Sequence, residues 1–294
     1  MNRYLLRASL ALVPAIAIAQ TPCEQLKSLK LADTDITLAE SAGPGPFPLP
    51  GAPPTAVAPS LPAFCRVAAT LKPSLDSEIK IEVWLPARDA WNGKYLAAGG
   101  GGWVGSINYG VMATAVREGY ATSSTDTGHA GPTAEFAVGH PEKVTDFAYR
   151  AVHEMTVKAK AIMAAHYGRD PRLAYWTGCS TGGRQGLMEA QRYPADFDGI
   201  IAGAPANNQI QLSAWRFALE TAALKNPARV VPLTKIALLN RAVLAACDAL
   251  DGVKDGFLSD PQKCRFDPST LLCRGAGADD CLTAPKWVAS RNGI

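Results

Sequence analysis

The sequence predicts an α/β fold with a largely parallel sheet. Short segments with the alternation or apolar composition of strands recur between residues 78 and 205. Helical segments separate most of them, and strands that alternate with helices generally form parallel sheets. Beyond residue 206 the pattern changes to helices and cysteine-rich loops, so we place a boundary between residues 206 and 207.

The first predicted elements lie between residues 78 and 131. Residues 78–87 (EIKIEVWLPA) alternate and are rich in β-branched side chains, which predicts a strand. Residues 94–103 (KYLAAGGGGW) are typical of a short strand that runs into glycines. Residues 106–119 can form a helix, and residues 119–131 indicate a strand followed by a loop.

The later elements lie between residues 142 and 205. In residues 142–167 the apolar side chains recur close to helical spacing on one face, which predicts a helix. Residues 172–180 (RLAYWTGCS) indicate a strand that ends in a turn, and the helix after it ends at Pro194. Residues 198–205 (DGIIAGAP) are typical of a fully apolar strand.

Residues 42–64 (AGPGPFPLPGAPPTAVAPSLPAF) are rich in proline and glycine. Both residue types disfavour regular structure, so we expect an ordered surface loop or a linker. A disulfide between Cys23 and Cys65 would close this segment off.

The first 19 residues have the pattern of a cleaved secretory signal peptide. Arg3 and Arg7 give a positive start, an apolar stretch follows, and Ala17-Ile18-Ala19 supplies small residues at the cleavage position. No later segment is long and apolar enough for a membrane span. We therefore expect a soluble, secreted or periplasmic protein. The net charge of +3 is dispersed, which indicates neither a nucleic-acid nor a membrane partner.

The sequence has seven cysteines, which should mostly pair in an exported protein. Proximity along the chain predicts three disulfides: Cys23–Cys65, Cys247–Cys264 and Cys273–Cys281. Cys179 is then left over. It is either a buried free thiol or a cysteine whose partner is not in this chain.

Ser180 is the candidate nucleophile. It lies between Gly178 and Gly182 in a G-x-S-x-G pattern, where an apolar strand ends and a helix begins. The strained turn of a nucleophile elbow needs small neighbours, and Gly183 supplies a further one. The helix dipole and the Thr181 backbone N–H would stabilise an oxyanion there. The alternative is a serine N-cap on an ordinary helix.

The glycine-rich loop at 99–105 (GGGGWVG) follows an earlier strand, where the second half of an oxyanion hole usually lies. Gly101 or Gly102 could donate its N–H, because a residue without Cβ lets the backbone approach a substrate closely. The same loop satisfies G-x-G-x-x-G with Gly100, Gly102 and Gly105, and Asp126 ends the next strand. This supports a rival dinucleotide-binding hypothesis.

A serine nucleophile needs a histidine base held by a carboxylate. In α/β-hydrolases these partners follow the serine along the chain. All four histidines of this sequence precede Ser180. Only His129, at the end of a predicted strand, could lie near the site, either as the base or, preferably, as a residue that lines the pocket.

Residues 247–257 (CDALDGVKDGF) form an acidic turn with glycines at its bends. Carboxylates at such short spacing suit Ca²⁺, which prefers hard oxygen ligands. The predicted ligands of a structural Ca²⁺ are the carboxylates of Asp248, Asp251 and Asp255 and the backbone carbonyls of Val253 and Phe257. The alternative is a solvated acidic loop.

These motifs together resemble the tannase/feruloyl esterase family of secreted α/β-hydrolases. The resemblance rests on GCSTGGRQG around Ser180, the GGGGWVG loop, STDTGH at 124–129, and CDALDGVKDGF followed by Cys264. It implies an α/β-hydrolase fold, with residues 20–206 as its N-terminal part and residues 207–294 as the beginning of an inserted calcium-bearing lid. It also implies that Ser180 hydrolyses small-molecule esters of phenolic or aromatic acids through an acyl-enzyme.

The resemblance also implies a role for Cys179. In this family a disulfide joins the cysteine beside the nucleophile to a cysteine beside the catalytic histidine. The partner of Cys179 and the catalytic Asp and His would then lie beyond Ile294. We expect a fragment or the product of a damaged gene, with little or no esterase activity. The alternative from another class is a non-catalytic protein that binds a small molecule.

Overall fold

The computed structural model describes residues 20–284 except residues 52, 54, 104 and 276–279. The chain divides into two compact units, Met1–Asn207 and Asn208–Ile294. This division falls one residue beyond the boundary expected between residues 206 and 207. The predicted signal peptide, residues 1–19, lies outside the described residues.

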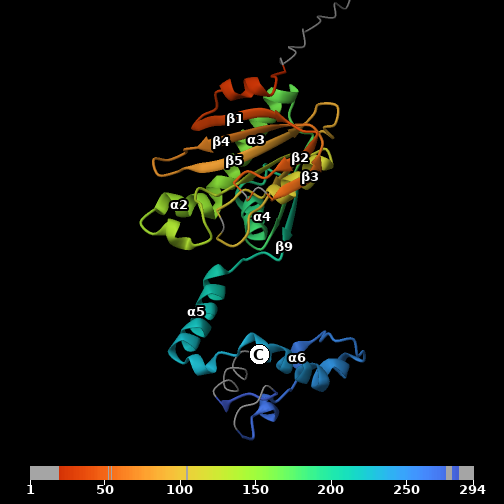
Figure 1. The fold of residues 1–294 in the computed structure, drawn as a ribbon. Coiled ribbons are helices and arrows are strands. Elements are labelled where there is room, and N and C mark those ends of the chain that lie inside the picture. Colours follow the sequence, from red (N-terminus) through yellow and green to blue (C-terminus); the bar gives the residue numbers. More distant parts are fainter. Residues whose placement is uncertain (1–19, 52, 54, 104, 276–279, 285–294) are drawn as a thin grey trace, which may run out of the picture. The chain divides into compact units, whose positions relative to one another are not determined.

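A mixed sheet forms the centre of the first unit, as Figure 1 shows. Within the described residues it has seven strands in the order β1–β4–β5–β7–β6–β8–β9. Their bounds are β1 (Thr34–Ala42), β4 (Phe64–Leu71), β5 (Ile79–Pro86), β6 (Lys94–Ala98), β7 (Ala121–Thr125), β8 (Leu173–Cys179) and β9 (Gly199–Gly203).

Parallel pairing is confined to one half of this sheet. The pairs β7–β6, β6–β8 and β8–β9 are parallel, whereas β1–β4, β4–β5 and β5–β7 are antiparallel. No helix separates β4 from β5, and strands without a crossover helix between them pair antiparallel. The prediction of a largely parallel sheet therefore holds for the half of the sheet in which strands alternate with helices. The pairs β1–β4, β4–β5 and β5–β7 form an antiparallel half that was not predicted.

The proline-rich segment 42–64 contains regular structure, so the expectation of a loop or linker is wrong. Strands β2 (Gly45–Pro48) and β3 (Val57–Leu61) pair antiparallel and form a separate two-stranded sheet, with Phe47 opposite Ala58. Proline is tolerated in such a ribbon because each strand has an outer edge that needs no N–H donor. Phe47 also packs edge-on against Phe64 and Trp84, each at 5.2 Å between ring centroids.

Helices cover both faces of the main sheet. They are α1 (Tyr109–Arg117), α3 (Ala151–Tyr167) and α4 (Thr181–Arg192). The helix predicted for residues 142–167 is confirmed as a helical run without a break, made of α2 (Pro141–Thr145), a turn of π-helix at Asp146–Arg150, and α3. Short 3-10 turns occupy Glu24–Ser28 and Ala134–Ala137.

Two apolar clusters hold these layers together. The larger joins the inner side chains of β4, β5 and β6 to α3, with Tyr95 and Trp176 at its centre. The smaller lies on the other face, where Trp84 of β5 packs with Met112 and Val116 of α1. Successive strand residues point to opposite faces, so one strand contributes to both clusters.

The second unit consists of helices and loops in its described part. Helices α5 (Gln209–Lys225) and α6 (Leu233–Cys247) are followed by 3-10 turns at Asp248–Asp251, Pro261–Lys263 and Pro268–Leu271, and a further turn at Pro227–Arg229 lies between the helices. Disulfides Cys247–Cys264 and Cys273–Cys281 staple the loops. None of the helices in the described residues is both long and apolar enough to span a bilayer.

Candidate active site

Ser180 lies in the turn between β8 and α4. Its backbone has φ 58° and ψ −114°, a region that residues other than glycine rarely adopt. Two bonds hold the turn: the Ser180 N–H donates to the Gly203 carbonyl at 3.0 Å, and the Ala206 N–H donates to the Ser180 carbonyl at 2.9 Å. Ser180 is exposed, and its side chain makes no capping bond to α4. This is the geometry of a nucleophile elbow rather than of an ordinary serine N-cap.

The glycines around Ser180 permit close backbone packing. A Cβ on Gly178 would lie 2.6 Å from the Gly182 carbonyl oxygen, and a Cβ on Gly182 would lie 2.9 Å from the Gly100 oxygen. A Cβ on Gly183 would lie 2.4 Å from the Gly203 oxygen. No side chain fits at these positions unless the backbone moves, which accounts for the small residues around the serine.

The glycine-rich loop is fixed to the start of α4 by polar side chains. The Thr181 hydroxyl donates to the Gly102 carbonyl at 2.9 Å, and the Gly100 N–H donates to Gln185 Oε1 at 3.1 Å. The bond to Gln185 occupies the Gly100 N–H, so Gly101 and Gly102 remain the candidates for the oxyanion hole. Sequence reasoning missed Gln185. Its place one helical turn after Thr181, on the same face of α4, is the signal that could have indicated it.

A pocket of about 550 Å³ borders the glycine-rich loop. Gly100, Gly101 and Gly102 line it together with Leu49 and residues 106–110. Asn108 holds residues 106–110 against the glycine-rich loop, because its side-chain amide donates to the Gly99 carbonyl at 2.8 Å. Ser180 is not among the residues that line the pocket.

His129 is buried and supports the loop rather than Ser180. Its Nε2 lies 2.7 Å from the Trp103 carbonyl oxygen, so Nε2 carries the proton and donates it there. The ring stacks on Phe136 at 3.7 Å and meets Phe147 edge-on. A nitrogen that donates to a carbonyl cannot accept the Ser180 proton. The arrangement therefore favours a structural role beneath the glycine-rich loop over the role of base, and His129 is not among the residues that line the pocket.

The other three histidines also have partners away from Ser180. His140 faces Asp76 at the surface, 3.0 Å away, and His166 bonds the Thr21 carbonyl at 3.0 Å. His153 bonds Asp196 at 2.7 Å. All four histidines are described, and none forms a hydrogen bond to Ser180.

Cys179 is an exposed free thiol beside Ser180, which contradicts the first of the two alternatives, a buried free thiol. The second alternative, a partner outside this chain, stays a prediction. The other six cysteines form disulfides between Cys23 and Cys65, Cys247 and Cys264, and Cys273 and Cys281.

The contacts of Asp126 argue against the dinucleotide-binding hypothesis. Its side chain is only 7% exposed, and its Oδ1 accepts the Lys80 and Gly128 N–H groups at 2.9 and 2.8 Å. Burial raises the pKa of Asp126 to about 6, although the two amide bonds oppose that shift. The Asp126 carboxylate is thus bound to backbone N–H groups of the protein. It does not point to a place where it could accept a hydrogen bond from the ribose of a dinucleotide.

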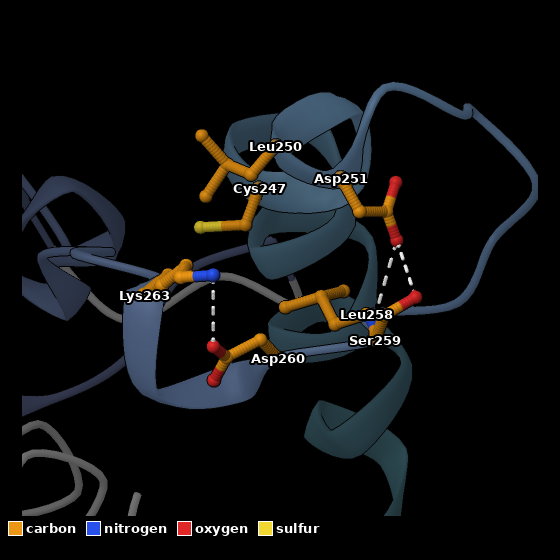
Figure 2. Close-up of a pocket in the computed structure, with 7 residues that line it drawn as sticks. All are labelled: Cys247, Leu250, Asp251, Leu258, Ser259, Asp260 and Lys263. Carbon is orange, nitrogen blue, oxygen red and sulfur yellow. Dashed lines mark hydrogen bonds and ion pairs between the residues drawn. The ribbon is translucent and has the colours of Figure 1, made fainter.

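The acidic turn in the second unit is ordered by its own backbone. Gly252 and Gly256 have positive φ angles of 93° and 80°, as its sharp bends require. Oδ1 of each aspartate accepts a backbone N–H at about 3 Å: Asp248 from Gly256, Asp251 from Val253, and Asp255 from Phe257. The cavity beside the turn, drawn in Figure 2, is only about 40 Å³.

The predicted ligands in this turn fit Ca²⁺, because all of them are carboxylate or carbonyl oxygens. A carboxylate that caps an amide through one oxygen can bind a cation through the other. Asp251 uses its second oxygen as well, since Oδ2 accepts the Ser259 hydroxyl at 2.6 Å, as Figure 2 shows. This hydroxyl is the main reason why the pKa of Asp251 is lowered. A bound ion would have to displace or share that bond.

Comparison with known proteins identifies the family. The model for tannase and feruloyl esterase matches residues 65–292. The chain belongs to the tannase and feruloyl esterase family. It is 41% identical to an uncharacterized esterase of Xanthomonas campestris pv. campestris, over 97% of this chain and 49% of that protein. It is 40% identical to a probable feruloyl esterase B-1 of Aspergillus fumigatus, over 75% of this chain and 42% of that protein.

Solved structures agree with this family membership. A crystal structure of feruloyl esterase B from Aspergillus oryzae matches with a TM-score of 0.81 and 34% identity, over 92% of this chain and 55% of that one. An esterase from the same organism matches with a TM-score of 0.82 and 31% identity over the same shares of the two chains. The α/β-hydrolase fold implied by the resemblance is confirmed. The chain spans about half the length of the curated relatives that it matches.

Proposed function

We propose that this chain supplies the nucleophile half of a secreted carboxylic ester hydrolase for esters of phenolic or aromatic acids. The observation that carries the proposal is the strained, exposed backbone of Ser180 at the N-terminus of α4. A serine in this conformation presents its hydroxyl above the end of the sheet, where an ester carbonyl can approach. The same proposal includes cleavage of a signal peptide after residue 19 and export of the protein.

The reaction begins when the Ser180 hydroxyl oxygen attacks the ester carbonyl. The general base takes the Ser180 proton, and the N–H groups of Thr181 and of Gly101 or Gly102 stabilise the oxyanion. As the acyl-enzyme forms, the bond to the alcohol oxygen breaks and the alcohol leaves with the proton returned by the base. Water then attacks the acyl-enzyme and releases the aromatic acid. The Thr181 hydroxyl supports this arrangement, because its bond to the Gly102 carbonyl holds the two halves of the oxyanion hole together.

The base is the part of this mechanism that the chain does not supply. Each of its histidines is engaged elsewhere, so we propose little or no turnover by the 294-residue chain alone. The same observation supports a second candidate function, a non-catalytic protein that binds an aromatic small molecule. In both cases we expect no nucleic-acid or membrane partner.

A chimera tests the proposal. The chain is extended with the C-terminal half of the Xanthomonas relative, and hydrolysis of methyl ferulate, methyl gallate and methyl butyrate is measured. We expect turnover of the aromatic esters, and we expect Ser180→Ala to reduce it by about 10³-fold or more. Ser60→Ala, at an exposed serine of β3, is the matched control.

A fluorophosphonate probe separates the two candidate functions. It should label Ser180 rapidly in the chimera and slowly in the 294-residue chain, because only an activated serine reacts quickly. Unchanged hydrolysis by the Ser180→Ala chimera would overturn the assignment of the nucleophile. A folded chimera that binds methyl ferulate but neither reacts with the probe nor hydrolyses the ester would favour the binding protein.

A further inference from the structure

A second cluster of titratable side chains lies at the far end of α4. Within the described residues, His153 of α3, Glu189 of α4 and Asp196 form a group of three whose ligand atoms lie within 4.8 Å of one another. Glu189 follows Ser180 by nine residues, which is roughly 13 Å along a helix axis. The cluster is therefore separate from the candidate active site.

Glu189 is the unusual member of the cluster. Its side chain is 1% exposed, and both carboxylate oxygens are buried without a hydrogen-bond partner. The Asp196 carboxylate is its neighbour in the cluster. Two carboxyl groups that meet in a buried place need either a proton or a cation between them, because an unpaired buried charge is costly.

Among the described residues, no lysine or arginine is paired with the Glu189 or Asp196 carboxylate; the basic neighbour of Asp196 is His153. Lys160 donates its Nζ proton to the backbone carbonyl of Asp196, at 2.6 Å, and not to a carboxylate. His153 Nδ1 lies 2.7 Å from Asp196 Oδ2, and the ring is fixed by stacking on Tyr193 at 3.7 Å. The cluster thus offers one imidazole nitrogen and two carboxylates in fixed positions.

We propose that His153, Glu189 and Asp196 bind a divalent first-row transition-metal ion, for which Zn²⁺ is the probe. An imidazole with two carboxylates is a donor set that Zn²⁺ accepts, with water in the fourth position. Ligands at about 2.1 Å from a tetrahedral ion lie roughly 3.4 Å from each other, which is within the 4.8 Å that encloses the cluster. The ion would take the place of the proton between His153 Nδ1 and Asp196 Oδ2, and these two atoms, 2.7 Å apart, would have to separate. The ion's charge of +2 would balance the two carboxylates. The partly exposed His153 side chain gives the ion a route from solvent.

Such an ion would be structural. It would tie α3 to α4 and to the loop that leads into β9, because the three ligands come from these three segments. The Gly203 carbonyl at the end of β9 is the group that accepts the Ser180 N–H. The metal would therefore stabilise the packing of α3, α4 and β9 that supports the turn at Ser180. It would not contact the substrate.

Zinc uptake by the 294-residue chain tests the proposal. The exposed thiol of Cys179 is a competing Zn²⁺ ligand, so all variants carry Cys179→Ser. After treatment with a chelator, the protein is titrated with Zn²⁺ against a chromophoric chelator. We expect one ion per chain, and we expect Glu189→Gln and His153→Ala to weaken binding at least tenfold. Circular dichroism verifies that the variants fold.

Two matched variants make the test specific. Glu154→Gln removes a carboxylate of α3 that pairs with Lys158 outside the cluster, and Asp251→Asn alters the acidic turn. Both should bind Zn²⁺ like the parent. Failure of the parent to take up one equivalent would overturn the proposal. So would an unchanged affinity in Glu189→Gln, or loss of uptake in Asp251→Asn.

Discussion

The two units of this chain are stabilised in different ways. The first packs apolar clusters on both faces of its sheet, and side chains such as Tyr95 and Trp84 are completely buried. In the second, α5 has no buried residue, and Trp215 and Phe217 are 59% and 67% exposed. Two disulfides close its loops instead. Burial of apolar surface stabilises the first unit, and covalent links that restrict the unfolded chain stabilise the second.

The largest effect is expected from Gly183→Ala in the first unit. The added Cβ would lie 2.4 Å from the Gly203 oxygen and 2.8 Å from the Pro205 Cα, both of them backbone atoms. We expect the free energy of unfolding of this unit to fall by more than about 3 kcal/mol, because overpacking of a close backbone contact is poorly tolerated. Denaturant unfolding measures it.

Gly110→Ala is the matched control, since its new Cβ would lie 3.9 Å from Asn108 Oδ1 within helix α1. This change should stabilise the first unit by about 0.5–1 kcal/mol through helix propensity. Equal effects of the two substitutions would contradict the close packing around Ser180.

The second effect concerns the disulfide Cys247–Cys264, which closes a loop of 17 residues. Its removal by Cys247→Ser with Cys264→Ser should destabilise the second unit by about 3 kcal/mol. Limited proteolysis should then cut residues 208–284 and leave the sheet unit intact. If the sheet unit is degraded at the same rate, the two units do not unfold independently.

The contrast between the units also explains what the sequence could predict. Residues 78–87 and 198–205 are recognisable because an alternating or apolar pattern follows directly from burial in a sheet. The disulfides of the second unit followed from proximity in the chain. The antiparallel β1 (Thr34–Ala42) and the β2–β3 ribbon were not predicted. Polar residues and prolines in these strands give no strand pattern, and the strands form because they pair with other segments of the chain.

The same distinction holds for the candidate site. The strained turn at Ser180 follows from glycines that are adjacent in sequence, so local reasoning predicted it. The bond from the Gly100 N–H to Gln185 and the bond from His129 to the Trp103 carbonyl join residues 85 and 26 positions apart. Contacts of this kind depend on the completed sheet, and one sequence carries no direct signal for them.

The third effect is a pH dependence within the first unit. Burial raises the pKa of Asp126 to about 6 from an ordinary value of 3.8. The folded state therefore keeps a proton that the unfolded state loses. This stabilising contribution is complete below pH 3.8 and is lost as the pH rises to 6.

Asp126→Asn removes the loss of stability between pH 3.8 and 6, because the amide does not ionise. The amide oxygen can still accept both backbone N–H groups. We expect the variant to exceed the parent in stability by on the order of 2 kcal/mol at pH 7.5 and not at pH 4. Unfolding curves at the two pH values measure the difference, with the exposed Asp35→Asn as control. A difference that does not change with pH would show that Asp126 is ionised in the folded state at both values.

The smallest effect concerns Ca²⁺ and the acidic turn, which we propose as a structural site. If Asp248, Asp251 and Asp255 bind the ion with the Val253 and Phe257 carbonyls, Ca²⁺ at ten times its Kd should stabilise the second unit by about 1.4 kcal/mol. Calorimetry with Ca²⁺ or a chelator measures the shift in Tm. Asp255→Asn should abolish that shift, because the turn then loses one of its carboxylates.

Asp260→Asn is the control for this experiment. Asp260 pairs with Lys263 at 3.2 Å, as Figure 2 shows, and is not a predicted ligand. The response to Ca²⁺ should therefore persist in this variant. Mg²⁺ should act more weakly than Ca²⁺, because it requires a smaller and more regular shell of ligands. If the shift in Tm is the same for both ions and survives in Asp255→Asn, the turn is a solvated acidic loop. In that case the hydrogen bonds of the three aspartates and the Cys247–Cys264 disulfide hold the turn in place without an ion.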